Sequence, residues 1–502
     1  MQKQALISVS DKSEILEMTE FLLEHNYKII STGGTFNFLK SKGLEVTEVS
    51  EITNFPEILD GRVKTLHPTI HSGILAKRNN EEHLKTLEEK KINTIDLVIV
   101  NLYPFFENAG KDLNLEELVE FIDIGGPTML RAAAKSFHDV TVICEPSDYD
   151  WVSEKIKNKE LTLEDRKHLA GKVFNLTSAY DGAIAKKLLD DNFPTYFNTS
   201  YKKSMSLRYG ENPHQQAAFY TSTFEKGAMK DFTQHQGKEL SFNNIRDMDI
   251  AWKVVNEFSE TCCCAVKHST PCGVAIDENI EIAYQKAHDC DPISIFGGIV
   301  AFNKKVTQKL AEKLNDIFLE IVIAPEYEPA ALAIFKSKKN VRIIQAELQI
   351  SDTLQYVKVD GGLLVQEVDN KFSTELNVVT EIQPTSQQMK DLIFAQKIIK
   401  HVKSNAIVVA KNFQALGVGT GQTNRIWAAK FAIERAKVTE SEDLVLASDA
   451  FFPFRDTVDF CAEQGISAII QPGGSIKDQD SIDACNENNI AMVMTGMRHF
   501  LH

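Results

Sequence analysis

Two adjacent side chains, Lys267 and His268, have the types that suit acyl transfer. A histidine can take a proton from an attacking amine, and an ammonium beside it can stabilise the oxyanion that forms. The pair follows an apolar run at residues 262–266, which predicts a buried strand, and Pro271 and Gly273 predict that this strand gives way to a loop. An isolated Lys-His pair is more often an ordinary strand end, so the rest of the chain must decide.

Composition limits the class of protein. The chain has 502 residues, which predicts two or three domains, and its formal net charge of −15 speaks against general nucleic-acid binding. No apolar run approaches the ~20 residues that span a bilayer, and no signal peptide is visible. The eight cysteines have no evenly spaced framework, so a cytoplasmic protein with reduced thiols is expected.

The first part of the chain alternates predicted strands with predicted helices, which favours a parallel α/β sheet. Strands are expected at residues 5–9 and 27–30, with helices at 13–24, capped by Ser10 and Asp11, and at 36–42. Between the second strand and its helix lies a turn with Gly33 and Gly34. Such a turn suits a phosphate, because free N–H groups and the helix dipole face the anion, but a tight turn that needs two glycines fits equally.

The segment 60–68 brings cations together. Arg62 and Lys64 lie two residues apart, so an extended chain would place both on one face, where they suit a phosphate or a polar heterocycle. His67 and His71 are four apart, as zinc ligands on a helix can be, but Pro68 disfavours a helix through the pair and no Glu follows His67. We therefore expect no metal there.

Further polar groups follow predicted strands. Asn101 and Tyr103 come directly after the apolar run 95–100, at the kind of position where open α/β sheets bind ligands. Asp123 precedes a Gly125-Gly126 turn that leads into a helix carrying Lys135 about three turns further on.

Beyond a polar stretch at 194–203 we predict a second domain, with the boundary at 197/198. Its loop at 207–215 is dense in hydrogen-bonding groups: Arg208 could hold a phosphate or carboxylate, and Tyr209 could stack on a base. Gly297 and Gly298 would let a ligand approach the backbone. Residues 402–408 weakly repeat 266–272, and 448–456 weakly repeat 291–298, which suggests two related halves, although chance similarity of short apolar strands explains this equally.

The chain resembles the family of bifunctional purine biosynthesis enzymes that join AICAR transformylase to IMP cyclohydrolase. The motifs that carry this resemblance are Lys267-His268, Arg208-Tyr209 and residues 61–68. The chain's blocks fall in the family's order, at residues 31–35, 60–68, 101–105, 123–135, 208–215, 267–273, 422–425 and 448–456. The resemblance covers essentially the whole chain. One departure is Thr270, which stands where the family usually has Asn or Ser.

The resemblance implies an α/β fold with a methylglyoxal-synthase-like cyclohydrolase domain over residues 1–197. It also implies a transformylase domain over 198–502, made of two cytidine-deaminase-like subdomains, and a homodimer with transformylase sites across the subunit interface. No tightly bound cofactor, nucleic acid or membrane is expected, although a structural potassium ion is implied by family analogy.

The resemblance further implies residue roles. In formyl transfer from 10-formyltetrahydrofolate to AICAR, which gives FAICAR, His268 would be the base, Lys267 the cation and Asn405 a residue that holds the formyl centre. Phe451 and Asp456 would lie near the folate, and the nucleotide would be held by Arg208, Tyr209, Gly297, Glu320, Arg425 and Arg498. In ring closure of FAICAR to IMP, the catalytic set would be Lys64, Tyr103, Asp123 and Lys135. The substrate would be bound by Ser10, Lys12, Ser31, Thr32, Gly33, Gly34, Thr35, Arg62, Thr65, Asn101, Gly125 and Gly126.

The sequence speaks against two other classes of protein. A nucleotide sensor would keep a phosphate pocket without chemistry, and the set Lys64, Asp123 and Lys135 speaks against it. A zinc nucleoside deaminase needs His-x-Glu and Pro-Cys-x-x-Cys, whereas this chain has Thr270 and Ala275 at the positions of the Glu and the second Cys. The adjacent cysteines 262–264 would alternate faces on a strand and could not chelate one zinc.

Overall fold

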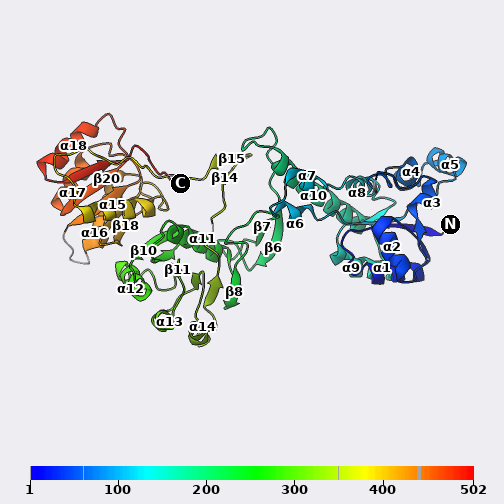
Figure 1. The fold of residues 1–502 in the computed structure, drawn as a ribbon, viewed down its shortest axis with the longest axis horizontal. Coiled ribbons are helices and arrows are strands. Elements are labelled where there is room, and N and C mark those ends of the chain that lie inside the picture. Colours follow the sequence, from blue (N-terminus) through cyan, green and yellow to red (C-terminus); the bar gives the residue numbers. More distant parts are fainter. Residues whose placement is uncertain (1, 60, 349, 438–442) are drawn as a thin grey trace. The chain divides into compact units, whose positions relative to one another are not determined.

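The computed structural model describes residues 2–59, 61–348, 350–437 and 443–502. The chain forms two compact units (Figure 1). The first comprises Met1–Lys202 and Ser222–Glu225, and the second comprises Lys203–Thr221 and Lys226–His502. The division after Lys202 lies a few residues beyond the boundary predicted at 197/198.

The first unit contains a five-stranded parallel sheet in the order β3-β2-β1-β4-β5, with β1 at Lys3–Ser8, β2 at Tyr27–Ser31, β3 at Thr47–Glu48, β4 at Leu97–Val100 and β5 at Thr141–Ile143. All four residues of β4 are buried, as expected for a parallel strand with both faces covered. The predicted parallel α/β architecture of this unit is confirmed. The helices are α1 (Ile15–Glu24), α2 (Gly33–Ser41), α3 (Val49–Thr53), α4 (Pro68–Leu75), α5 (Glu81–Glu89), α6 (Phe105–Ala109), α7 (Leu115–Val119), α8 (Gly125–Lys135), α9 (Tyr149–Asn158) and α10 (Leu163–Leu188).

Two local predictions for this unit differ from the structure. Helix α1 begins at Ile15 after Glu14, so Ser10 and Asp11 do not cap it. Residues 61–64 form a turn rather than an extended segment, because Gly61 has a φ of +89° and Arg62 N donates to Leu59 O. Asp60, which opens that predicted motif, lies outside the described residues.

The second unit is built on a twelve-stranded mixed sheet in the order β16-β21-β20-β19-β17-β18-β10-β9-β11-β12-β13-β8. The strands are β8 (Thr233–Gln236), β9 (Cys262–Lys267), β10 (Thr270–Ile276), β11 (Ile299–Phe302), β12 (Ile321–Ala324), β13 (Arg342–Gln345), β16 (Asn377–Val378), β17 (Ile407–Lys411), β18 (Gln414–Gly419), β19 (Leu444–Ser448), β20 (Ile466–Gln471) and β21 (Ala491–Met494). Two smaller hairpins pair β6 (Tyr201–Leu207) with β7 (Ala217–Ser222) and β14 (Leu354–Val359) with β15 (Gly362–Glu367).

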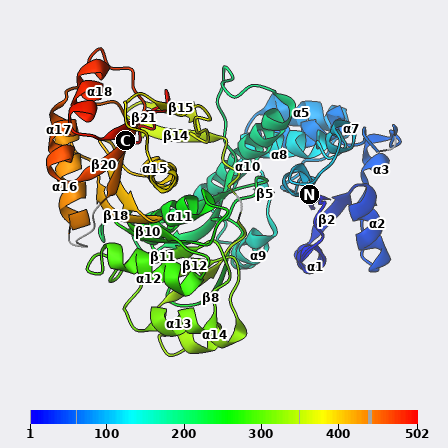
Figure 2. The same ribbon diagram turned by 60° about the vertical axis from the view of Figure 1, so that its left-hand side comes forward.

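The two halves of this sheet repeat each other. Reading outward from the central β10·β18 pair, each half has the same succession of antiparallel, antiparallel, parallel, parallel and antiparallel neighbours. Helices α11 (Phe242–Asn256) and α15 (Ser386–Ile399) share one hydrophobic core on one face. The other face is covered in one half by α12 (Ile280–Cys290), α13 (Gln308–Asn315) and α14 (Pro329–Phe335), and in the other by α16 (Arg425–Lys437), α17 (Asp456–Glu463) and α18 (Asp478–Glu487) (Figure 2).

The alternation of side chains along β9 determines which core each of the cysteines 262–264 joins. Cys262 and Cys264 belong to the core under α11 and α15, whereas Cys263 belongs to the core under α12 to α14. Adjacent residues of a strand face opposite sides of the sheet, so these thiols pack into two separate cores. Among the described residues, no group of three or more His, Cys, Asp or Glu could hold a metal ion, and no described helix is long and apolar enough to cross a bilayer.

Candidate functional sites

The first unit has a cavity of about 850 Å³ beyond the carboxyl ends of β1, β2 and β4, the edge at which open α/β sheets commonly bind ligands. Most residues predicted for ring closure line it: Ser10, Lys12, Thr32, Gly34, Thr35, Arg62, Lys64, Thr65, Asn101, Tyr103, Asp123, Gly125 and Gly126. Segments far apart in the chain therefore converge on one space large enough for a nucleotide.

Two predicted ligand groups are used by the protein itself. Ser31 is fully buried and donates its hydroxyl hydrogen to Ile7 O at 2.8 Å, so it joins two strands and does not face the cavity. Asn101 fixes the loop after β1, since its Oδ1 accepts from Asp11 N at 3.0 Å and its Nδ2 donates to Asp11 O at 2.9 Å. Both residues shape the site through the backbone.

The turn that was predicted to suit a phosphate lies at the start of α2. Gly33 and Gly34 form the first turn of this helix, whereas the sequence predicted that the helix would start at Phe36. The Lys12 ammonium reaches Thr35 Oγ1 at 3.4 Å, and burial lowers the pKa of Lys12. A phosphate here would meet helix N–H groups and a partly desolvated cation.

Lys64 enters the cavity from the turn at residues 61–64. Its side chain is 25% exposed, and Nζ lies 3.6 Å from Oε1 of Glu57, an ion pair that the sequence analysis missed. A Cβ on Gly33 would lie 3.0 Å from Lys64 Nζ, and one on Gly61 would lie 2.5 Å from Glu57 Oε1, so both glycines make room for this pair. Arg62 instead forms an exposed ion pair with Glu120.

Asp123 is held from two sides. Its Oδ1 accepts from Gly126 N at 2.8 Å in the first turn of α8, and its own N–H donates to Tyr180 Oη at 2.9 Å. The Tyr180 hydroxyl in turn donates to Phe121 O at 2.8 Å. Tyr180 comes from α10, 57 residues away, so no sequence spacing could have pointed to it.

Burial controls the titration of the two acid–base candidates. Burial raises the pKa of Asp123 despite the hydrogen bond from Gly126 and the charge of Lys64, which lower it. Burial also raises the pKa of Tyr103, and the carboxylates of Asp123 and Glu57 add to that rise. Asp123 is therefore a stronger base than an exposed carboxylate, and Tyr103 keeps its proton at neutral pH.

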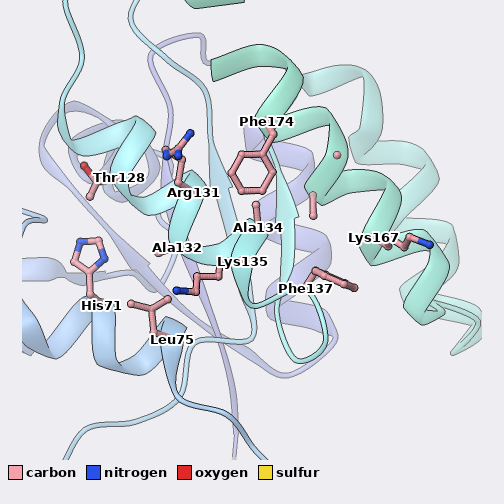
Figure 3. A pocket seen from close by; sticks show the side chains of 12 residues that line it. His71, Leu75, Thr128, Arg131, Ala132, Ala134, Lys135, Phe137, Lys167 and Phe174 are labelled. Carbon is pink, nitrogen blue, oxygen red and sulfur yellow. The ribbon is translucent and has the colours of Figure 1, made fainter. Parts of the chain in front are cut away.

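Lys135 does not join this set. It is the last residue of α8, whereas Asp123 lies just before the first, and a helix of that length separates its ends by about 15 Å. Lys135 lines a different cavity of about 650 Å³, together with His71, Leu75, Arg131 and Phe174 and other residues of α4, α8 and α10 (Figure 3). Within this chain, the structure therefore does not bring Lys135 together with Lys64, Tyr103 and Asp123.

In the second unit, His268 lies at the tip of a hairpin. The predicted loop after the strand is instead a two-residue turn, His268-Ser269, followed by β10. Pro271 is tolerated beside an irregularity in the strand pairing, and Gly273 is needed because a Cβ there would lie 2.0 Å from Ala287 O of α12. His268 is exposed, and Thr270 Oγ1 is 3.5 Å from His268 O.

The turn is tied to α11 by a residue that the sequence analysis missed. The Asp247 carboxylate accepts from His268 N at 3.1 Å, from Ser269 N at 2.8 Å and from Ser269 Oγ at 3.0 Å. Lys267 donates from Nζ to Phe296 O at 2.8 Å, beside Gly297, whose φ of +70° suits glycine.

Arg425 is engaged by neighbouring groups of the protein, although its Nε has no hydrogen-bond partner among the described residues. It is 5% exposed, forms a buried ion pair with Asp449, and donates to Ala406 O at 3.1 Å and to Asn405 Oδ1 at 2.7 Å. Asn405 is also engaged through its Nδ2, which donates to Gln422 O at 2.7 Å. Arg425 therefore builds the sheet edge and fixes Asn405.

The remaining predicted residues differ in their exposure and in the partners that they have within the protein. Glu320 forms an ion pair with the buried Arg342, so one carboxylate oxygen is engaged. Arg208 and Arg498 are exposed, and each lies over an aromatic ring of a near neighbour, Tyr209 at 5.5 Å and Phe500 at 4.8 Å. Phe451 is 36% exposed, and Asp456 begins α17.

Strand directions place most of these groups at one edge of the twelve-stranded sheet. The end of β9, the starts of β11, β12 and β17 and the end of β19 all meet there, which follows from the pairing of Ile299 with Val266 and of Ile407 with Gly419 and Ser448. In the sheet order β17-β18-β10-β9, the segments of Asn405 and His268 are three positions apart, or about 14 Å.

Comparison with known proteins identifies the family of this chain. A family model described as "MGS-like domain" matches residues 14–128, which places the first unit in the class of methylglyoxal-synthase-like domains. A second family model, described as "AICARFT/IMPCHase bienzyme", matches residues 133–435. The chain belongs to this family of AICAR transformylase/IMP cyclohydrolase bienzymes, and it therefore has both activities in purine biosynthesis.

Relatives match along their full length. The chain is 60% identical over 504 residues to "Bifunctional purine biosynthesis protein PurH" of Fusobacterium nucleatum subsp. nucleatum, and 59% identical over 503 residues to the protein of that name from Clostridium acetobutylicum, with 100% of each chain covered. A solved structure titled "Crystal structure of ForH" is 34% identical, with 38% of this chain and 100% of that chain covered and a TM-score of 0.35, which carries no argument about the fold.

Proposed function

We propose that the two activities are divided between the two units. FAICAR cyclises to IMP in the cavity of the first unit. The formyl group passes from 10-formyltetrahydrofolate to AICAR at the sheet edge that carries His268. The observation that carries this division is the cavity of the first unit, which gathers Lys64, Tyr103 and Asp123 without any residue of the second unit.

In ring closure, the carboxamide nitrogen of FAICAR bonds to the formyl carbon and the formyl oxygen leaves as water. The carboxamide nitrogen loses one proton and the formamido nitrogen loses another, and the leaving oxygen gains both. Asp123, with its raised pKa, is suited to accept the amide proton, and Lys64 and Tyr103 can donate hydrogen bonds to the oxygen. The start of α2 and Lys12 would hold the substrate phosphate.

In formyl transfer, the amine of AICAR bonds to the formyl carbon, the bond from that carbon to N10 of the folate breaks, and N10 gains a proton. His268 would take the proton that the amine loses, and Lys267 would stabilise the oxyanion. The aromatic amine is a poor nucleophile, so positioning must supply much of the rate.

We also propose that the chain acts in the cytoplasm as a homodimer. All eight cysteines are free, as expected in a reducing compartment. The segments of His268 and Glu320 lie about 10 Å apart across the sheet, and those of Glu320 and Asn405 about 24 Å apart, so one ligand cannot touch every predicted group of one chain. A second copy could complete each set. The implied potassium ion stays a prediction.

Two substitutions test the division. His268→Ala should abolish formation of tetrahydrofolate from AICAR and 10-formyltetrahydrofolate, yet leave cyclisation of supplied FAICAR intact. Lys64→Ala should do the reverse, and Lys85→Ala, at an exposed lysine of α5, should affect neither. If both site variants stayed folded and each lost both activities, the division would be wrong. Formyl transfer should also fall at dilutions at which sedimentation shows monomers, while cyclisation persists.

A further inference from the structure

The turn that carries His268 has a conformation that its own residues do not favour. His268 and Ser269 have φ values of +51° and +58°, so both lie in the left-handed region. Two-residue hairpin turns of this kind prefer Asn, Asp or Gly. The Cβ of other residues approaches the backbone carbonyl at an energetic cost, which Gly avoids and which Asn and Asp offset by local hydrogen bonds. Contacts outside the turn must therefore hold it in place.

Asp247 provides these contacts. One carboxylate oxygen accepts from His268 N, and the other accepts from both the N–H and the hydroxyl of Ser269, at 2.8–3.1 Å. Asp247 lies on α11, whose Met248, Ala251 and Trp252 are buried in the core. The turn is thus fastened to a rigid helix through charged hydrogen bonds, which are stronger than neutral ones.

The other half of the sheet contains the same device without a histidine. The β17–β18 turn is Asn412-Phe413, with φ values of +50° and +58°, and Asp391 of α15 accepts from Asn412 N at 2.9 Å and from Phe413 N at 2.7 Å. Asn412 therefore corresponds to His268. The histidine occupies a position where the related half has a residue that tolerates this backbone well.

We infer that Asp247 is a positioning residue for formyl transfer: it holds the backbone of His268 in the left-handed conformation that presents the imidazole at the sheet edge. This inference rests on the proposed role of His268. Asp247 contacts the backbone of His268, and its effect is on the geometry from which the imidazole takes the proton.

The test compares matched variants of the full chain. Asp247→Ala should lower kcat for formyl transfer by roughly 100-fold, the order expected for a misplacement of about 1 Å, with KM for AICAR changed less than about threefold. Asp247→Asn, which keeps one acceptor, should fall in between. Asp391→Ala removes the same device from the other half and should leave kcat within about twofold.

A second variant separates geometry from chemistry. Adding Ser269→Gly to Asp247→Ala supplies a residue that adopts the left-handed conformation freely, so part of kcat should return. No recovery, or equal loss of kcat in Asp391→Ala, would overturn the inference, as would full kcat in Asp247→Ala. If Asp247→Ala does not fold, Asp247→Asn decides by the same criteria. Full activity of His268→Ala would instead overturn the proposed function, so the two failures are distinguishable.

Discussion

The burial of Arg425 makes a prediction that separates a structural residue from a ligand-binding one. In Arg425→Met, the Asp449 carboxylate loses its guanidinium partner, and the side chain of Asp449 is 0% exposed. The oxygens of Ala406 and Asn405 each lose a donor as well. The substitution therefore leaves the buried carboxyl group of Asp449 without its ionic partner, and the oxygens of Ala406 and Asn405 each with one hydrogen-bond donor fewer.

The size of the effect follows from this environment. Breaking a buried ion pair by removing one partner typically costs about 3–5 kcal/mol in the free energy of unfolding. At about 2 °C per kcal/mol for a large domain, the unfolding transition of the second unit should fall by roughly 6–10 °C. Arg455→Met is the control, because Arg455 pairs with Asp459 and Glu487 at the surface, where such pairs contribute about 1 kcal/mol or less.

The assay combines denaturant unfolding of both variants with steady-state kinetics of formyl transfer. Arg425→Met should unfold at lower denaturant, and the double variant Arg425→Met/Asp449→Leu should recover part of that loss because the unpaired carboxyl group is gone. If Arg425→Met kept its stability within about 1 kcal/mol but raised KM for AICAR tenfold or more, Arg425 would contact a ligand, which would refute a purely structural role.

Three further predictions concern the first unit. Burial raises the pKa of Asp123 in the folded chain above its value in the unfolded chain. The contribution of Asp123 to stability is therefore full below the unfolded pKa and is lost as pH rises through the folded pKa. Asp123→Asn should be more stable than the parent at pH 7 but not at acid pH, and it should lose cyclisation. A Cβ at Gly126 would lie 2.4 Å from Asp123 Oδ2, so Gly126→Ala should lower kcat for FAICAR cyclisation by about tenfold, whereas Gly171→Ala, in a helix with open space around it, should not. Tyr180→Phe leaves Asp123 N–H without its acceptor and should destabilise the chain by about 1–3 kcal/mol in denaturant unfolding, and unchanged stability would contradict the assigned role of its hydroxyl.

Local sequence patterns predicted what depends on neighbours in the chain. The alternation of buried strands and helices predicted the parallel sheet of the first unit, and Asn101 and Tyr103 after β4 were expected where open α/β sheets bind ligands, the edge at which the cavity lies. In the second unit, Pro271 and Gly273 were interpreted as strand breakers. Gly273 is in fact required inside β10 by the approach of Ala287 O, a contact with a later helix that local preference does not encode.

The internal repeat was detected in the wrong register. Sequence similarity paired residues 402–408 with 266–272, but the hydrogen-bonded turns pair Asn412 with His268. Short apolar strands resemble one another at many offsets, whereas the aspartate that fastens each turn lies on a separate helix. The ion pair between Arg425, which the family resemblance assigns to the nucleotide, and Asp449 could not be predicted from local patterns, because the two residues lie far apart in the sequence.

The two halves of the second unit therefore share one backbone device, a left-handed turn fastened by a helical aspartate, and differ in the residue that the device presents. Where the turn carries Asn412, the side chain suits the backbone. Where it carries His268, the backbone is held against the preference of the residue, and the group presented is one that can accept a proton from an amine. Conformational cost of about 1–2 kcal/mol for a residue of this kind is tolerated where the surrounding structure fixes it, which is the situation that Asp247 creates.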